Sequence, residues 1–313
     1  IVACGTAMHA GLIGKRLIER FSGIPVSVEI ASEFRYSAPI VSENDLFIAI
    51  SQSGETADTL AALRLAKSLG MYTLSVVNVV GSSVARESDG VIYTCAGPEI
   101  AVASTKAYIV QLSVLYLLAA HFGLCRGRLS EREVSAFISD LKSAAPDAVA
   151  SVIAGAEEIK AAAETIKDAE DIFYIGRGAD YFLAEEASLK LKEVSYIHSE
   201  AYPAGELKHG TISLITDGVP VIAIANTREL HDKMINNIKE VRARGAYVLL
   251  LCGADFPETT GIADTVIRLP ALREELMPLP TATAFQLLAY YTSVLRGCDV
   301  DKPRNLAKSV TVE

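Results

Sequence analysis

The residues of this chain with the clearest chemical potential are the hydroxyl and amide side chains around one glycine at Ser51–Thr56 (SQSGET). They follow an apolar, strand-like segment at 46–50 and precede a helical pattern at 57–69. Because the first N–H groups of a helix are unpaired and its dipole favours negative charge, this pattern predicts an anion site. No Walker-type lysine follows the glycine, which favours a phosphate monoester over a nucleoside triphosphate. Ordinary N-capping is the alternative explanation.

A second chemical feature is a row of charged residues in the helical pattern at 181–196. Glu186, Lys190 and Glu193 are four and three residues apart, so they share one helix face. Apolar residues flank the row, whereas Ser188 and Ser195 fall on the opposite face, where we expect solvent. Charges among apolar neighbours cost desolvation energy unless they pair or do chemistry, so we predict a catalytic helix. A solvated surface ion pair is the alternative.

Two further residues, His209 and Lys308, carry groups that could react. His209 precedes Gly210 and is either a proton carrier that titrates near neutrality or a cation at a helix C-terminus capped by the glycine. Lys308 lies in the polar terminus at 299–313. From the residue types alone, we would expect such a terminal segment to be poorly ordered.

Strand-like and helical segments alternate along the first half of the chain, which predicts a parallel α/β sheet with helices on both faces. The expected strands are 1–4, 26–30, 46–50, 72–77 and 90–93, and the expected helices are 7–21, 31–36, 57–69 and 103–122.

The second half repeats this order after a helical connection at 130–168, so we infer an internal duplication. Its elements are strands at 171–175, 219–225 and 247–252 and helices at 181–196 and 229–244. The counterpart of the SQSGET loop is Asn226–Glu229, which lacks the glycine and the serines. Gly176-Arg177-Gly178 resembles a dinucleotide fingerprint without its third glycine. The predicted domains are 1–150 with the anion loop, 151–298 with the catalytic helix, and a tail at 299–313.

The composition of the chain argues against several classes of function. A net charge of −9 argues against a nucleic-acid partner. The five cysteines are scattered without CxxC pairs, which indicates a reducing compartment and no metal site. No apolar run reaches the roughly 18 residues of a membrane span, so we expect a cytoplasmic protein. The chain begins at Ile1 within a strand-like run, which suggests part of a longer protein.

The SQSGET loop resembles the phosphate loop of sugar isomerase (SIS) domains, which bind phosphosugars on a flavodoxin-like αβα sandwich. Other segments resemble the tandem SIS domains of the aminotransferase family that makes glucosamine 6-phosphate from fructose 6-phosphate. They are EIASEFR at 29–35, ASTK at 103–106, LKLKE at 189–193, GELKHG at 205–210 and DKPRNLAKSVTVE at 301–313. The resemblance implies two such domains in tandem, followed by an active-site tail.

The resemblance also implies roles for individual residues. Lys308 would form an imine with the C2 carbonyl of fructose 6-phosphate, and Glu193 would move a proton between C1 and C2, with Glu186 and Lys190 beside it. His209 would open the sugar ring from the second subunit of a homodimer. The residues expected to hold the phosphate are Thr6, Ser51, Gln52, Ser53 and Thr56, and those expected to hold the sugar are Val102 and Ser104. The products would be glucosamine 6-phosphate with ammonia and glucose 6-phosphate without it, and no cofactor or metal is implied.

The residues of this chain depart from the family pattern at two positions, and one domain of the family is not expected among them. Ala7 replaces a common serine, which removes a hydroxyl donor, and Thr211 replaces a common proline after the KHG motif. The family's glutaminase domain is not among these residues, so we expect no glutamine hydrolysis. Two alternatives stay open. One is a non-catalytic phosphosugar sensor, which would need the loop but not Glu193, His209 or Lys308; the other is a stand-alone SIS deaminase or isomerase.

Overall fold

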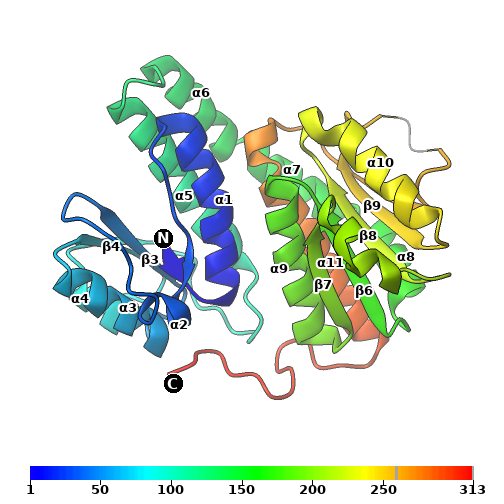
Figure 1. Cartoon of the computed structure of the whole chain (residues 1–313), viewed down its shortest axis with the longest axis horizontal. Coiled ribbons are helices and arrows are strands. Elements are labelled where there is room, and N and C mark those ends of the chain that lie inside the picture. The colour runs from blue at the N-terminus through cyan, green and yellow to red at the C-terminus, as the bar shows by residue number, and fades with distance from the viewer. Residues whose placement is uncertain (258–259, 312–313) are drawn as a thin grey trace. The chain divides into compact units, whose positions relative to one another are not determined.

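The computed structural model describes residues 1–257 and 260–311. The chain divides into two compact units, one formed by Ile1–Ile138 with the tail from Asn305 onward, and the other by Ser139–Arg304. Each unit contains one five-stranded sheet in which every pairing is parallel. In Figure 1 the helices and strands of the first unit run from blue to teal, and those of the second from green to orange. The domain limits at 150/151 and 298/299 stay predictions.

The first sheet has the strand order β2-β1-β3-β4-β5. Its strands are β1 (Val2–Ala3), β2 (Glu29–Ile30), β3 (Leu46–Ser51), β4 (Tyr72–Val77) and β5 (Gly90–Tyr93). Its helices are α1 (Gly5–Ser22), α2 (Ala31–Phe34), α3 (Ala57–Ser68), α4 (Ser83–Glu87) and α5 (Lys106–Cys125), and α6 (Glu131–Lys142) crosses into the second unit.

Successive side chains of β3 enter the two faces of this sheet in turn. Phe47 and Ala49 belong to the core shared with α2, α3 and α4, and Figure 1 shows these helices together on one side of the sheet. On the other side α1 packs against α5. Gly14 permits this approach, because a Cβ there would lie 2.8 Å from Leu115 of α5. The SQSGET loop therefore joins a central strand of the sheet to α3, one of the helices packed on its first face.

The second sheet has the order β7-β6-β8-β9-β10, which repeats that of the first. Its strands are β6 (Asp171–Gly176), β7 (His198–Pro203), β8 (Pro220–Ala225), β9 (Tyr247–Gly253) and β10 (Thr265–Leu269). Its helices are α7 (Ala144–Ala154), α8 (Ala156–Ile166), α9 (Ala179–Ser195), α10 (His231–Arg242) and α11 (Pro278–Leu295), with 3-10 turns η1 (Glu206–His209), η2 (Thr211–Leu214), η3 (Arg228–Leu230) and η4 (Glu274–Leu276).

Side-chain alternation also divides this unit into layers. Val221, Ala223 and Ala225 of β8 share a core with α10. On the opposite face α11 packs against α7, α8 and α9. The predicted pair of parallel α/β sandwiches related by duplication is therefore confirmed, since both sheets have the same strand order.

Several elements were not predicted from the sequence. The edge strand β7 (HSEAYP) is polar and β10 (TVIRL) is short, so neither shows strand periodicity. The helix α11 opens with Pro-Leu-Pro and is buried along most of its length. Its sequence therefore lacks the alternation of apolar and polar residues that marks a surface helix. The strand expected at 26–30 is reduced to Glu29–Ile30, and the helical connection at 130–168 is three helices.

One helix within the described residues, α5, is long and apolar enough by composition to cross a membrane, with a mean hydropathy of 1.7. Half of that window is buried inside the structure. Its packing against α1 explains the apolar composition as that of a core helix.

Candidate active site

The SQSGET loop joins β3 to α3 at the carboxyl edge of the first sheet. Thr6, the second residue of α1, follows the neighbouring strand β1 at the same edge. In a sheet of order 2-1-3-4-5 the strand order reverses between strands 1 and 3, and ligands bind outside their carboxyl ends. The structure thus brings the residues predicted to hold phosphate to the edge where a ligand is expected.

Hydrogen bonds within the loop fix its shape. The Ser51 Oγ accepts the N–H of Gly54 at 2.9 Å, and the Ser53 Oγ accepts the N–H of Glu55 at 3.2 Å. Gly54 has a φ of +66°, and a Cβ there would lie 2.1 Å from the buried Ser82 Oγ. The position therefore requires glycine for both its conformation and its close approach to Ser82.

The acidic residue of the loop is bonded to α4. The Glu55 Oε1 accepts the backbone N–H of Ser83 at 2.8 Å, and the Gly54 carbonyl accepts that of Val84 at 3.0 Å. The backbone hydrogen bond from Ser83 lowers the pKa of the Glu55 carboxyl. This pairing explains how a loop suited to anions tolerates a glutamate.

The tail is bonded to the first unit at two points. The Lys308 Nζ donates to the carbonyl oxygen of Ala101 at 2.6 Å, and the N–H of Ala57 donates to the carbonyl oxygen of Val310 at 3.1 Å. Ala101 directly precedes Val102 and lies near Ser104, the residues predicted to hold the sugar, and Ala57 is the first residue of α3. The tail segment at 308–310 therefore lies against Ala101 and the start of α3, which are adjacent in sequence to the segment at 102–104 and the loop at 51–56. Sequence reasoning missed Ala101 and Val310 because both act through main-chain atoms.

The charged row on α9 is buried. Relative exposure is 0% for Glu186 and 2% for Lys190. The Lys190 Nζ lies 3.6 Å from a carboxylate oxygen of Glu186 and is hydrogen-bonded to Glu193, whose side chain is 21% exposed. Burial alone would lower the pKa of the Lys190 ammonium, but these two carboxylates raise it above its ordinary value. Lys190 is therefore a buried cation held between two acids, and Glu193 is the acid with access to solvent.

The expectation that the serine face of α9 is solvated is wrong. Ser188 and Ser195 are 1% and 0% exposed. The Ser188 hydroxyl is hydrogen-bonded to that of Ser199 on β7, and the Ser195 hydroxyl donates to the Leu191 carbonyl. The elements β7, β6 and α11 pack against α9, so small hydroxyl side chains are buried on a face that the sequence pattern assigned to water.

His209 is exposed at the end of η1, and Gly210 follows it with a φ of +135°. The glycine therefore ends this turn as expected, although the turn is a 3-10 helix and not an α-helix. His209 and the charged row belong to the second unit, whereas the SQSGET loop, Thr6 and Lys308 belong to the first.

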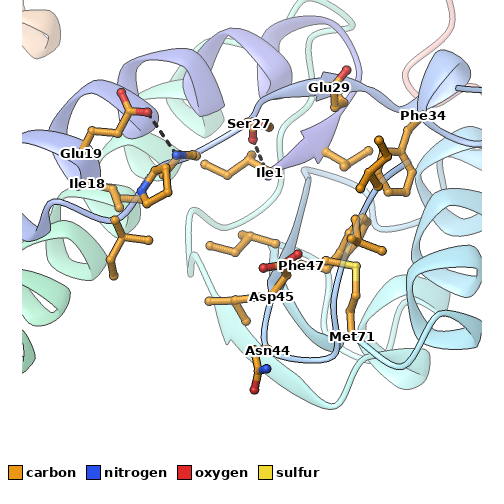
Figure 2. Close-up of a pocket in the computed structure, with 18 of the residues that line it drawn as sticks. Ile1, Ile18, Glu19, Ser27, Glu29, Phe34, Asn44, Asp45, Phe47 and Met71 are labelled. Carbon is orange, nitrogen blue, oxygen red and sulfur yellow. Dashed lines mark hydrogen bonds between the residues drawn. The ribbon is translucent and has the colours of Figure 1, made fainter. Parts of the chain in front are cut away.

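A cavity of about 590 Å³ lies within the first unit, at the opposite edge of its sheet. Figure 2 shows Ile1, Phe47 and Met71 around it, at or next to the amino ends of β1, β3 and β4, together with the carboxylates of Glu29 and Asp45. Ligands of parallel sheets bind at the carboxyl ends of strands, and carboxylates repel a phosphate. This cavity is therefore not the anion site.

The chain belongs to the SIS domain family, whose model matches residues 1–121 and 165–296. It is similar along its whole length to glutamine–fructose-6-phosphate aminotransferase [isomerizing] from Caldanaerobacter subterraneus subsp. tengcongensis, at 57% identity, and from Symbiobacterium thermophilum, at 56%. The chain spans about half the length of these relatives, 51% in each case.

A solved structure agrees with this family assignment. The C-terminal domain of glucosamine-fructose-6-phosphate aminotransferase from Francisella tularensis superposes with a TM-score of 0.93 at 40% identity. The match covers 96% of this chain and 86% of that one. The family resemblance expected from the sequence is confirmed.

Proposed function

We propose that this chain is the sugar-phosphate isomerase portion of a glutamine–fructose-6-phosphate aminotransferase. The observation that carries the proposal is its similarity, over all of its residues and at 50–57% identity, to relatives that bear this name. The substrate is then fructose 6-phosphate. Its phosphate binds at Ser51–Thr56 with Thr6, and its sugar lies along Val102 and Ser104.

The reaction begins when the sugar opens to its ketone, with His209 as proton carrier. The amine of Lys308 attacks C2 and water leaves, which forms an imine. When ammonia is present it displaces the lysine from C2. Glu193 then removes a proton from C1 and returns it to C2, so the product carries an amino group on C2 and an aldehyde at C1, as glucosamine 6-phosphate does.

Without ammonia, water hydrolyses the imine and releases Lys308. The same transfer by Glu193, from C1 to C2 of the ketone through an enediol, gives glucose 6-phosphate. In both routes the developing negative charge lies close to a protonated Lys190, and Glu186 holds that cation in place.

The assembly and location are part of this proposal. We propose a homodimer in which the exposed His209 serves the site of the partner subunit. A glutaminase domain of the full-length protein would supply the ammonia. The five cysteines are all free, which suits a reducing, cytoplasmic setting.

The test is incubation of the purified chain with fructose 6-phosphate, without glutamine, while glucose 6-phosphate is followed with a coupled dehydrogenase. Product formation is the expected result. Tight binding of fructose 6-phosphate without product would instead support a non-catalytic phosphosugar sensor. The absence of binding would mean that the loop serves a different phosphosugar.

A further inference from the structure

The second sheet has its own point where strand order reverses, between the neighbouring strands β6 and β8. In the first sheet the corresponding strands, β1 and β3, are followed by Thr6 and the SQSGET loop. The same position in the second sheet lies between the start of α9 and the loop that begins at Asn226. A fold of this type binds ligands at such a position.

A side chain of the protein itself fills this position. The Asp180 carboxylate, only 2% exposed, accepts the backbone N–H of Asn226 at 2.9 Å and that of Thr227 at 3.0 Å through Oδ2. Its other oxygen accepts the Asn226 amide Nδ2–H at 3.0 Å. In each of these three contacts an N–H group donates to the carboxylate, which suits an ionised carboxylate because it can only accept hydrogen bonds.

The glycines of the incomplete fingerprint explain how Asp180 reaches the loop. A Cβ on Gly176 would lie 2.4 Å from the Asp180 carbonyl group, and Gly178 has a φ of +60°. Both positions therefore demand glycine, and together they fold the start of α9 tightly against the end of β6. The fingerprint-like sequence serves an internal contact and not a nucleotide.

We propose that Asp180 is a resident anion that fills the ligand position of the second sheet, so that only the first unit is open to a phosphosugar. Burial raises the pKa of the Asp180 carboxyl, and the N–H groups of Thr227 and Asn226 oppose this rise. The same contacts join α9 to the loop after β8 and, through the Asn226 amide and the Thr281 hydroxyl, to α11. Asp180 is in this sense also a positioning residue for the charged row on α9, a role that rests on the proposed function.

The test uses formate, because Asp180→Ala deletes a group of that chemistry and size. The unfolding midpoint of the full chain is measured calorimetrically in sodium formate and in sodium chloride at equal ionic strength. We expect Asp180→Ala to lower the midpoint by about 5 °C or more, since buried N–H groups lose their acceptor. Formate should restore part of this loss in a saturable way. The wild type and the control Asp232→Ala, at an exposed position of α10, should each have the same unfolding midpoint in the two salts.

Equal midpoints in formate and chloride for a folded Asp180→Ala variant would overturn the proposal. If that variant does not fold, the same measurement on Asp180→Asn tests the proposal. It keeps the shape of the side chain, and we expect a lowered midpoint without a formate response; a wild-type midpoint would show that no anion is needed. These measurements use no sugar, so a failure of the proposed function leaves them valid. Binding of two fructose 6-phosphate molecules per chain would contradict the single open site.

Discussion

The ammonium group of Lys308 is hydrogen-bonded to the carbonyl oxygen of Ala101, at 2.6 Å, across 207 residues of sequence. The next residue, Val102, begins the segment assigned to the sugar. A carbonyl oxygen accepts a hydrogen bond from an amine, so this contact orients the side chain of Lys308. A lysine oriented in this way suits the proposed imine formation, because the hydrogen bond that holds its nitrogen at the Ala101 carbonyl contributes only about 1 kcal/mol.

Borohydride reduction in the presence of fructose 6-phosphate should attach the sugar to Lys308. Reduction converts an imine into a stable amine, so peptide mass mapping would locate the modified residue. Lys308→Arg keeps the charge but cannot form the imine, and we expect it to abolish labelling. Lys302→Ala, at an exposed position of the tail, is the matched control and should label normally. Labelling of another lysine would reject this role for Lys308.

Glu193→Gln should lower turnover by about 10²–10⁴-fold, the usual contribution of a general acid–base group. Binding of fructose 6-phosphate should change little, since the residues proposed to hold the phosphate belong to the other unit. Steady-state assay with calorimetric titration would separate the two effects. Glu170→Gln changes an exposed carboxylate just before β6 and should leave both unchanged. Wild-type turnover in Glu193→Gln would remove this residue from the mechanism.

Glu55→Ala should raise the KM for fructose 6-phosphate about fivefold to thirtyfold, with a smaller change in kcat. The substitution deletes the acceptor of the Ser83 N–H, a capping contact of about 1–2 kcal/mol that holds the loop in shape. Glu55→Gln retains an acceptor and should have a smaller effect. The exposed Glu43→Ala is the control for loss of a carboxylate from the same unit. An unchanged KM in Glu55→Ala would mean that α4 does not support the loop.

Asp89 should make the first unit sensitive to acid. The hydroxyl of Thr73 at 2.7 Å and its N–H at 2.9 Å, together with the Lys67 ammonium at 3.0 Å, lower the pKa of Asp89 to about 2. Because the folded-state value lies below the unfolded value of about 3.9, this contribution is complete above pH 4 and is lost as the pH falls towards 2.

Urea unfolding of wild type and Asp89→Asn at several pH values tests this contribution. The variant should be less stable near pH 6, and the difference should shrink as the pH falls below about 4. Asp168→Asn, at an exposed position, should show no such trend. A stability difference that stays constant from pH 6 to pH 3 would contradict the assignment.

The sequence predicted the features that depend on regular patterns. The strand–turn–helix at 46–69 and the charged row on α9 lie in segments with regular apolar patterns, so the elements themselves followed from the sequence. The repeat at 171–252 was found in the same way, and the matching strand orders confirm it.

Features that depend on long-range packing were not predicted. Ser188 and Ser195 look solvated because serine is polar, but β7 and α11 cover them, and neither element had been foreseen. The carboxylate of Asp180 is one acid among many in the sequence. Its role emerges only when the loop after β8 folds back against the start of α9.

The bond from the Ala57 N–H to the Val310 carbonyl has a consequence for observing the tail. First-turn amides of a helix normally exchange their hydrogens with water quickly, because no carbonyl of the helix protects them. The amide of Ala57 is protected by a residue from the other end of the chain. Its exchange rate is therefore a native reporter of how often the tail leaves α3, and it needs no label, ligand or substitution.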